Sequence, residues 1–117
     1  MTITIQKLLY EALLNQTIYP VYSRYHHSLP IPHIHLENIQ VSSLPYSQEL
    51  YKYDKIDAII TINDNSSSNK RCLQALDAIC KILKALSLHN LCITTQVNNT
   101  KASATITVTF THISSTL

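Results

Sequence analysis

Four histidines in the first third of the chain are the residues whose types and spacing could do chemistry. His33 and His35 would share one side of an extended strand, and His26 and His27 lie just upstream. Imidazole nitrogens bind zinc, but a structural site needs four ligands, so Glu37 or a distant cysteine would have to complete it. The simpler interpretation is that these histidines are polar surface or interface residues. We therefore predict no cofactor and assign no metal-ligating residues.

Tyrosines are concentrated in the same part of the chain. Six of the seven fall between residues 19 and 53, namely Tyr19, Tyr22, Tyr25, Tyr46, Tyr51 and Tyr53. Aromatic rings can stack on nucleic-acid bases, but such sites usually line a basic groove, and only Arg24, Lys52 and Lys55 are nearby. Tyrosine is also enriched at protein interfaces because it is large, rigid and amphipathic. Core packing, a protein interface and base stacking all remain open interpretations.

The segment 19–53 is our candidate contact region with other proteins. The candidate residues are Tyr19, Tyr22, Arg24, Tyr25, His26, His27, His33, His35, Tyr46 and Tyr51. Three carboxylates flank or lie within the strand predicted over residues 55–63, namely Asp54, Asp57 and Asp64. We expect Asp57 to contact solvent or an oppositely charged side chain. No Ser/His/Asp or Cys/His set stands out, so we predict that the protein is not an enzyme.

Composition narrows the class of protein further. The 117 residues, 45% apolar and 14% charged, fit one folded domain. The complete absence of glycine excludes P-loops, dinucleotide fingerprints and nucleophile elbows, which need glycine for tight turns. The net charge is +2, and the Lys and Arg residues are scattered along the chain. They form no basic cluster of the kind that binds nucleic acid. No apolar run approaches the ~18 residues that span a membrane, and no signal peptide is recognisable, so we expect synthesis without export.

The cysteines are expected to be structural. Cys72, Cys80 and Cys92 form no CxxC pair, and two of them fall within an apolar helical pattern. Small buried thiols in a reducing compartment are the simplest interpretation.

The elements that must position these residues centre on a buried strand followed by a long helix. Residues 55–63 alternate with the period of a strand, and the short polar side chains of residues 64–69 favour a turn and a helix start. From Lys70 apolar residues recur at spacings of four and three, which predicts a core-facing helix of about 20 residues. Its expected stripe is Cys72, Leu76, Ile79, Leu83 and Leu86, widened by Leu73, Ala75, Ile82 and Ala85.

The remaining elements follow from the same patterns. Residues 3–15 predict a helix whose apolar face is Ile5, Leu8, Leu9, Ala12 and Leu13. Residues 19–32 are expected to be irregular, and residues 42–51 to form a loop. Residues 33–41 predict a strand whose alternation changes phase near Glu37 and Asn38, which indicates a bulge or two covered faces. Residues 91–97 and 104–111 predict two strands joined by a tight turn at Asn98 and Asn99.

This order of elements predicts an α+β fold. The expected architecture is a two-layer sandwich, a mainly antiparallel sheet of about four to five strands with two helices packed on one face. One domain would span residues 1–117. The last strand would present a threonine face suited to solvent or a second subunit, formed by Thr105, Thr107, Thr109 and Thr111.

The whole-chain pattern resembles the tail-completion or tail-terminator proteins of long-tailed phages, prophages and gene-transfer particles. The matching features begin with a short helix, Ile5 to Leu14, and an Ile-Tyr-Pro step at residues 18–20. A Leu-Pro-Ile-Pro-His-Ile lead into a strand follows at residues 29–34. A strand then runs through an Asn/Ser-rich turn into a long helix, residues 56–86, before a final hairpin. Family members commonly have glycines around the first loop and the strand-to-helix turn, where this chain has polar residues.

The resemblance implies a structural protein of virion assembly without catalytic residues. Its copies would form a homo-oligomeric ring, hexameric in relatives, that caps the tail tube and stops its growth. The implied partners are further copies of the chain, the tail tube protein and a head-completion or connector protein, with no membrane and no specific nucleic acid. The implied location is the virion tail, or the bacterial host cytoplasm during assembly. The alternatives are a small cytoplasmic α+β binding module, regulatory or nucleic-acid-associated, and after it an enzyme or zinc-binding domain.

Overall fold

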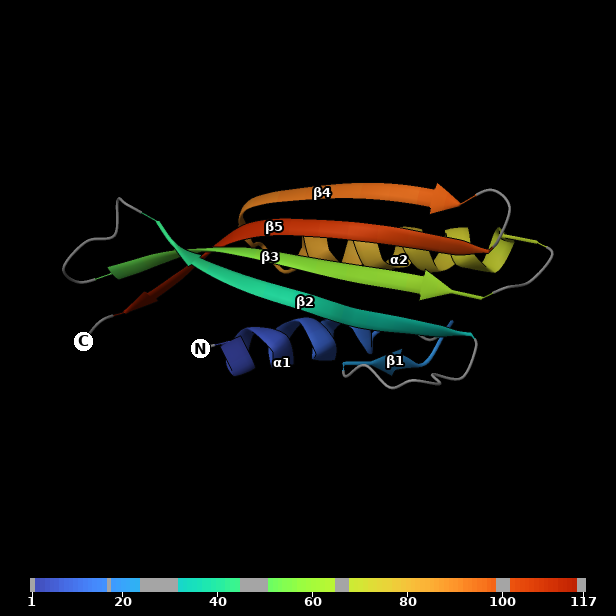
Figure 1. The fold of residues 1–117 in the computed structure, drawn as a ribbon, viewed down its shortest axis with the longest axis horizontal. Helices are drawn as coiled ribbons and strands as arrows, with labels where there is room; N and C mark the ends of the chain where they lie inside the picture. The colour runs from blue at the N-terminus through green and yellow to red at the C-terminus, as the bar shows by residue number, and fades with distance from the viewer. Residues whose placement is uncertain are drawn as a thin grey trace.

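A computed structural model describes residues 2–16, 18–23, 32–44, 51–64, 68–98 and 102–115 (Figure 1). Its elements in chain order are α1 (Thr2–Leu13), β1 (Val21–Tyr22), β2 (His33–Ser43), β3 (Tyr51–Asn63), α2 (Lys70–Ala85), β4 (His89–Asn98) and β5 (Ser103–Ser115). The predicted α+β class is confirmed. Among the described residues, no helix has both the length and the apolar character that a membrane crossing requires.

The described strands form one mixed sheet in the order β1-β2-β3-β5-β4. The pairs β2–β3, β3–β5 and β4–β5 are antiparallel, whereas β1 runs parallel to β2. Pairing of β4 with β5 confirms the predicted hairpin. The pairing extends to Asn98 and Ser103, so Asn98 belongs to β4 and not to the turn as predicted, and residues 99–101 lie outside the described residues. The irregular segment predicted over residues 19–32 is wrong at Val21 and Tyr22, because a two-residue strand is too short to show a period.

A bulge in β2 accounts for the change of phase seen in its sequence. The register between β2 and β3 shifts between Glu37 and Gln40. An extra residue in one strand resets the alternation, so Ile34 and Leu36 before the bulge share a face with Val41 after it. Of the two explanations that the sequence left open, the register shift shows the bulge.

The core is one cluster of buried side chains from the sheet and from both helices. Its sheet side is made of alternate residues of β2, β3 and β5, including Ile60 and Ile106, which are completely buried. Ile5, Leu9 and Leu13 come from α1, and Cys72, Ala75, Ile79 and Leu83 from α2. Fully burying one such aliphatic side chain contributes about 1.5–3 kcal/mol, so this cluster stabilises the association of the helices with the sheet.

Some residues of the predicted helical stripes lie outside the core. Leu8 is 39% exposed and Leu73 is 42% exposed. Each lies at the margin of its stripe, and the periodicity does not tell how wide a stripe the sheet covers. The second helix also ends at Ala85, itself exposed, and is shorter than predicted. Ser87 follows with a φ of 55°, the left-handed conformation that glycine usually adopts after a helix.

At one end of the sheet, β3 and β5 continue beyond the other strands. Pairing of β2 with β3 reaches Asp54 and that of β4 with β5 reaches Thr111, but the β3–β5 ladder continues to Tyr51 and Ser115. Figure 1 shows this end reaching past the helices. The loop predicted over residues 42–51 is therefore wrong at both of its ends, because residues 42 and 43 belong to β2 and Tyr51 to β3. Residues 45–50 lie outside the described residues.

Candidate interaction surface

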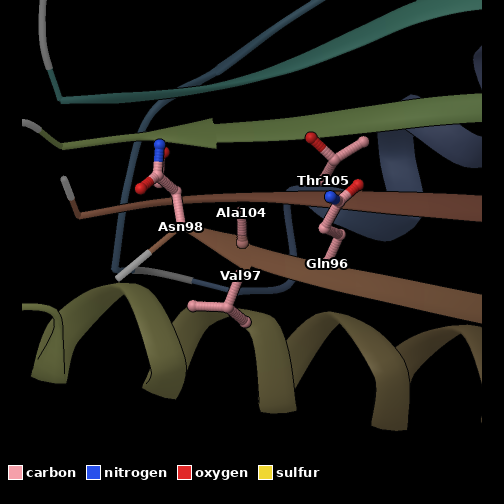
Figure 2. A pocket seen from close by; sticks show the side chains of 6 residues that line it. Gln96, Val97, Asn98, Ala104 and Thr105 are labelled. Atoms are coloured by element: carbon pink, nitrogen blue, oxygen red, sulfur yellow. The ribbon is translucent and has the colours of Figure 1, made fainter. Parts of the chain in front are cut away.

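Uncharged polar side chains line up across the sheet face that points away from the helices. Strand pairing places two rows next to each other: His33, Asn63, Ser103 and Asn98, and beside them His35, Thr61, Thr105 and Gln96. We call these residues the polar end. Figure 2 shows Gln96, Asn98 and Thr105 pointing away from α2, whereas Val97 and Ala104 lie on its side. The polar end therefore belongs to the face opposite the core.

Two adjoining depressions hollow the polar end. One has a volume of about 460 Å³ and lies over the β4–β5 hairpin, and the other, of about 490 Å³, extends across to His33 and Asn63. They share Asn98, Ser103 and Thr105, so they form one groove. Its hydroxyl and amide groups donate and accept hydrogen bonds without formal charge. Small-molecule pockets are lined mainly by apolar groups, and this groove differs from them in its many polar groups.

The two strand histidines are less accessible than the sequence suggested. His33 and His35 lie on the same side of β2, as predicted, but are only 8% and 6% exposed. Tyr22 lies edge-on to His33, with ring centroids 6.2 Å apart and an interplanar angle of 81°. Within the part of the chain that the structure describes, no three His, Cys, Asp or Glu side chains are grouped so that they could hold a metal ion. The two histidines thus form a buried border of the polar end.

Tyr19 joins three separate segments of the chain. Its hydroxyl donates a hydrogen bond to Oδ2 of Asp64, which follows β3. The Arg71 guanidinium of α2 lies 5.1 Å from the centre of the Tyr19 ring, and its Nη2 donates to the Ile18 carbonyl at 3.1 Å. Such a cation–π contact adds about 0.5–1 kcal/mol or more. Tyr19 is only 4% exposed, so its side chain contributes mainly to packing within this chain.

Gln16 holds the turn that leads from α1 to Tyr19. Its Nε2 donates to the Tyr19 carbonyl at 2.6 Å, and its Oε1 accepts from the backbone N–H groups of Ile18 and Tyr19 at 3.0 and 3.1 Å. The residue is 5% exposed, so these backbone groups would otherwise be buried without partners. In the sequence Gln16 is only the residue that follows the predicted helix of residues 3–15. Nothing in its local pattern shows which backbone groups the tertiary fold brings to it.

The acidic residues of β3 differ in their surroundings. Half-buried Asp57 accepts a hydrogen bond from Thr109 Oγ1 at 2.8 Å and stays partly exposed to solvent, as expected. Asp54 is fully buried on the helix-facing side, and its Oδ2 has no hydrogen-bond partner. Opposite it on β5, His112 has a buried Nδ1 without a partner. Asp54 falls in phase with Ile56, which was the sequence signal for its burial.

Of the other predicted contact residues, the two that the structure describes, Tyr22 and Tyr51, lie far apart. Tyr22 is half-buried next to His33, but Tyr51 is 47% exposed at the opposite end of β3. The 13 residues of β3 span roughly 40 Å at about 3.3 Å per residue, which separates Tyr51 from the polar end. Arg24, Tyr25, His26, His27 and Tyr46 lie outside the described residues.

The cysteines lie in three different environments. Cys72 is buried, Cys80 is half-buried and Cys92 is exposed, and all are free thiols. Burial raises the pKa of the Cys72 thiol, and the Asp64 carboxylate raises it further. Burial likewise raises the pKa of Cys80. The prediction of buried cysteines is thus wrong for Cys92, which lies on β4 at the edge of the sheet.

Comparisons with known proteins do not assign this chain to a family. No protein-family model matches the chain, and no curated protein matches its sequence.

The environment of Tyr19 predicts a specific dependence of stability on pH. Burial, followed by the hydrogen bond to Asp64, raises the pKa of Tyr19 above its ordinary value of 10.0. The folded state therefore favours the protonated phenol, and this contribution to stability is complete below about pH 10 and is lost as the pH rises towards the folded-state pKa. We expect the difference in unfolding free energy between the wild type and Tyr19→Phe to be constant below about pH 10 and to shrink above it.

Urea unfolding at a series of pH values measures this difference. Tyr51→Phe is the matched control, because its hydroxyl belongs to an exposed residue and its difference from the wild type should not change with pH. A constant difference for Tyr19→Phe into strong alkali would contradict the prediction.

Proposed function

We propose that the protein is a structural virion-assembly protein that acts like the tail terminators it resembles. Copies of the chain close into a hexameric ring, which caps the tail tube and joins it to the head-completion proteins. The observation that carries this proposal is the polar end, an uncharged groove on the sheet face opposite the core. The proposal includes the finer architecture expected from the sequence, a two-layer sandwich of four to five strands with two helices on one face.

A cyclic ring needs two different patches on each subunit, because each contact is heterologous. The polar end supplies one patch, and its hydroxyl and amide groups match a partner through shape and hydrogen bonds, with little contribution from charge. In this proposal the protein has no enzyme activity or cofactor, and its partners are other copies, the tail tube protein and a head-completion protein. It acts in the virion tail, or in the host cytoplasm during assembly.

Mass in solution, measured by light scattering across a range of concentrations and combined with negative-stain images, tests the ring. We expect a closed ring for the wild type and its loss in Thr105→Arg, because a guanidinium in the middle of the polar end adds an unpaired charge to the contact. Gln74→Arg makes a similar change at an exposed position of α2 and should leave the ring intact. A wild type that stays monomeric at every concentration, or a ring unaffected by Thr105→Arg, would contradict this assignment.

The same preparations separate the ring from the nucleic-acid-associated alternative. A protein that binds DNA through phosphates does so with an affinity that falls steeply with salt. We expect no salt-dependent mobility shift with DNA, since the polar end carries no formally charged side chain. A strong salt-dependent shift would favour the alternative.

A further inference from the structure

The strand β4 forms one edge of the sheet, and none of the described residues pairs with its outer side. It is 10 residues long, or roughly 33 Å at about 3.3 Å per residue. In an antiparallel pair alternate residues point their N–H and C=O groups away from the neighbouring strand. An edge of this kind can accept another strand. At the opposite edge of the sheet, β1 pairs with part of the outer side of β2. The remaining part of the β2 edge contains the bulge and the charged residue Glu37, which both disfavour pairing with another strand.

The sequence of this edge lacks the usual protection against pairing. Residues 92–98 read Cys-Ile-Thr-Thr-Gln-Val-Asn, without a charged residue, proline or glycine. Natural edge strands are usually protected by charges, proline or bulges. The register shift in β4 falls between His89 and Cys92, so the segment that follows is regularly paired with β5. Uncharged segments of high β-propensity are the ones that pair with other chains.

We propose that residues 92–98 of β4 pair antiparallel with the same residues of a second copy of this chain, around a two-fold axis at Thr95. This register places Ile93 opposite the partner's Val97, and Thr94 opposite the partner's Gln96. The segment suits a copy of itself because no charge is placed opposite a like charge, and threonine pairs across strands are favourable. A two-fold contact of this kind is isologous and closes on itself.

The helix side of β4 supports the same register. Ile93 and Val97 are half-buried and pack against the core cluster, so part of each side chain remains accessible. Beside them a groove of about 360 Å³ runs between α2 and β4, lined by Cys80, Lys84, Leu91, Ile93 and Thr95. In the proposed pairing the partner's Val97 extends the apolar side of the groove past Ile93, which removes apolar surface from water.

This contact is independent of the proposed ring. A ring with cyclic symmetry needs heterologous contacts, whereas pairing of β4 with its own copy produces a two-copy unit. An assembly that contained both contacts would have dihedral symmetry. Each proposal can therefore fail without the other.

Sedimentation equilibrium of the full chain measures the contact directly. We expect the wild type to associate reversibly about a two-fold axis, as pairs of single chains or, where the ring also forms, as pairs of rings. Thr95→Lys places two ammonium groups opposite each other at the axis, and we expect it to weaken the dimer by about ten-fold or more because like charges oppose association. Thr107→Lys is the matched control, since Thr107 is also an exposed strand threonine but lies on β5, inside the sheet. Circular dichroism checks that each variant is folded.

Cysteine cross-linking tests the register. In a Cys92→Ala background, oxidation of Thr95→Cys should give a disulfide-linked dimer, because the axis brings the two Cα atoms to within the roughly 4.4–6.8 Å that a disulfide spans. Oxidation of the wild type should not link Cys92 to Cys92, because this register places Cys92 opposite the partner's Asn98. Linkage through Cys92 with none through Thr95→Cys would overturn the register.

The outcomes separate the two-fold contact from the ring. A wild type that is monomeric at all concentrations, or a dimer that Thr95→Lys leaves unchanged, overturns the two-fold contact. A single hexameric ring whose mass is the same in the wild type and in Thr95→Lys supports the ring and overturns the two-fold contact. A dimer abolished by Thr95→Lys, without any ring, supports the two-fold contact and contradicts the ring.

Discussion

Replacing Ile79 with alanine is expected to lower the free energy of unfolding by about 2–5 kcal/mol. Ile79 is fully buried in the middle of α2, where the helix packs on the sheet. Truncation removes apolar contacts and leaves a cavity that the surrounding side chains fill only in part. Urea unfolding followed by circular dichroism measures this loss. The urea concentration at the midpoint of unfolding should fall, while the dependence of the unfolding free energy on urea concentration should stay the same.

Leu73→Ala on the same helix is the matched control for Ile79→Ala. Leu73 was predicted to share the apolar stripe but is 42% exposed, so its truncation should cost less than about 1.5 kcal/mol, well below the loss expected at a fully buried position. Similar losses for the two variants would mean that α2 packs through a different face.

The replacement Gln16→Ala is expected to destabilise the protein by about 2–4 kcal/mol, because three hydrogen bonds of roughly 1 kcal/mol each are lost. Those bonds satisfy the backbone of Ile18 and Tyr19, and the 5% exposure of Gln16 leaves little room for water to replace them. Thermal or urea unfolding of the variant measures the effect.

Two further variants show whether the Gln16 bonds are the cause. Gln16→Glu keeps an acceptor for the two N–H groups but loses the donor to the Tyr19 carbonyl, so it should retain part of the stability. Gln6→Ala removes a glutamine on α1 that donates a single bond of 3.2 Å to the Ser23 carbonyl, and should cost only about 0.5–1.5 kcal/mol. Equal losses in Gln6→Ala and Gln16→Ala would contradict the role of Gln16 in the turn.

The parts of the fold that could be predicted are those where one residue period continues over several turns or strand pairs. The alternation around Ile60 and Ile106 predicts both central strands and their buried face correctly. The change of phase near Glu37 predicts the bulge in β2. In each case the pattern reflects burial along the whole element, so it is visible without knowledge of the partner elements.

What could not be predicted depends on contacts between segments far apart in the chain. The first residues of β3, from Tyr51 to Asp54, are mixed in polarity, so the sequence did not predict a strand there. They are extended because they pair with β5. The polar end combines side chains of four strands, and only strand order and register bring His35 next to Thr61 and Thr105. In the sequence the histidines and the threonine face are separate features, because one chain without its topology does not say which strands are neighbours.

The continuation of β3 and β5 beyond the other strands has a consequence for how the molecule opens. The core cluster begins at Ile56 in β3 and ends at Phe110 in β5, so the outer ends of these strands lie beyond it. Next to this boundary, Asp54 and His112 each bury an atom without a hydrogen-bond partner. A two-stranded ribbon by itself is marginally stable in water. This end can therefore open in a sub-global step while the helices and the rest of the sheet stay folded, so each of the two longest strands spans two cooperative units.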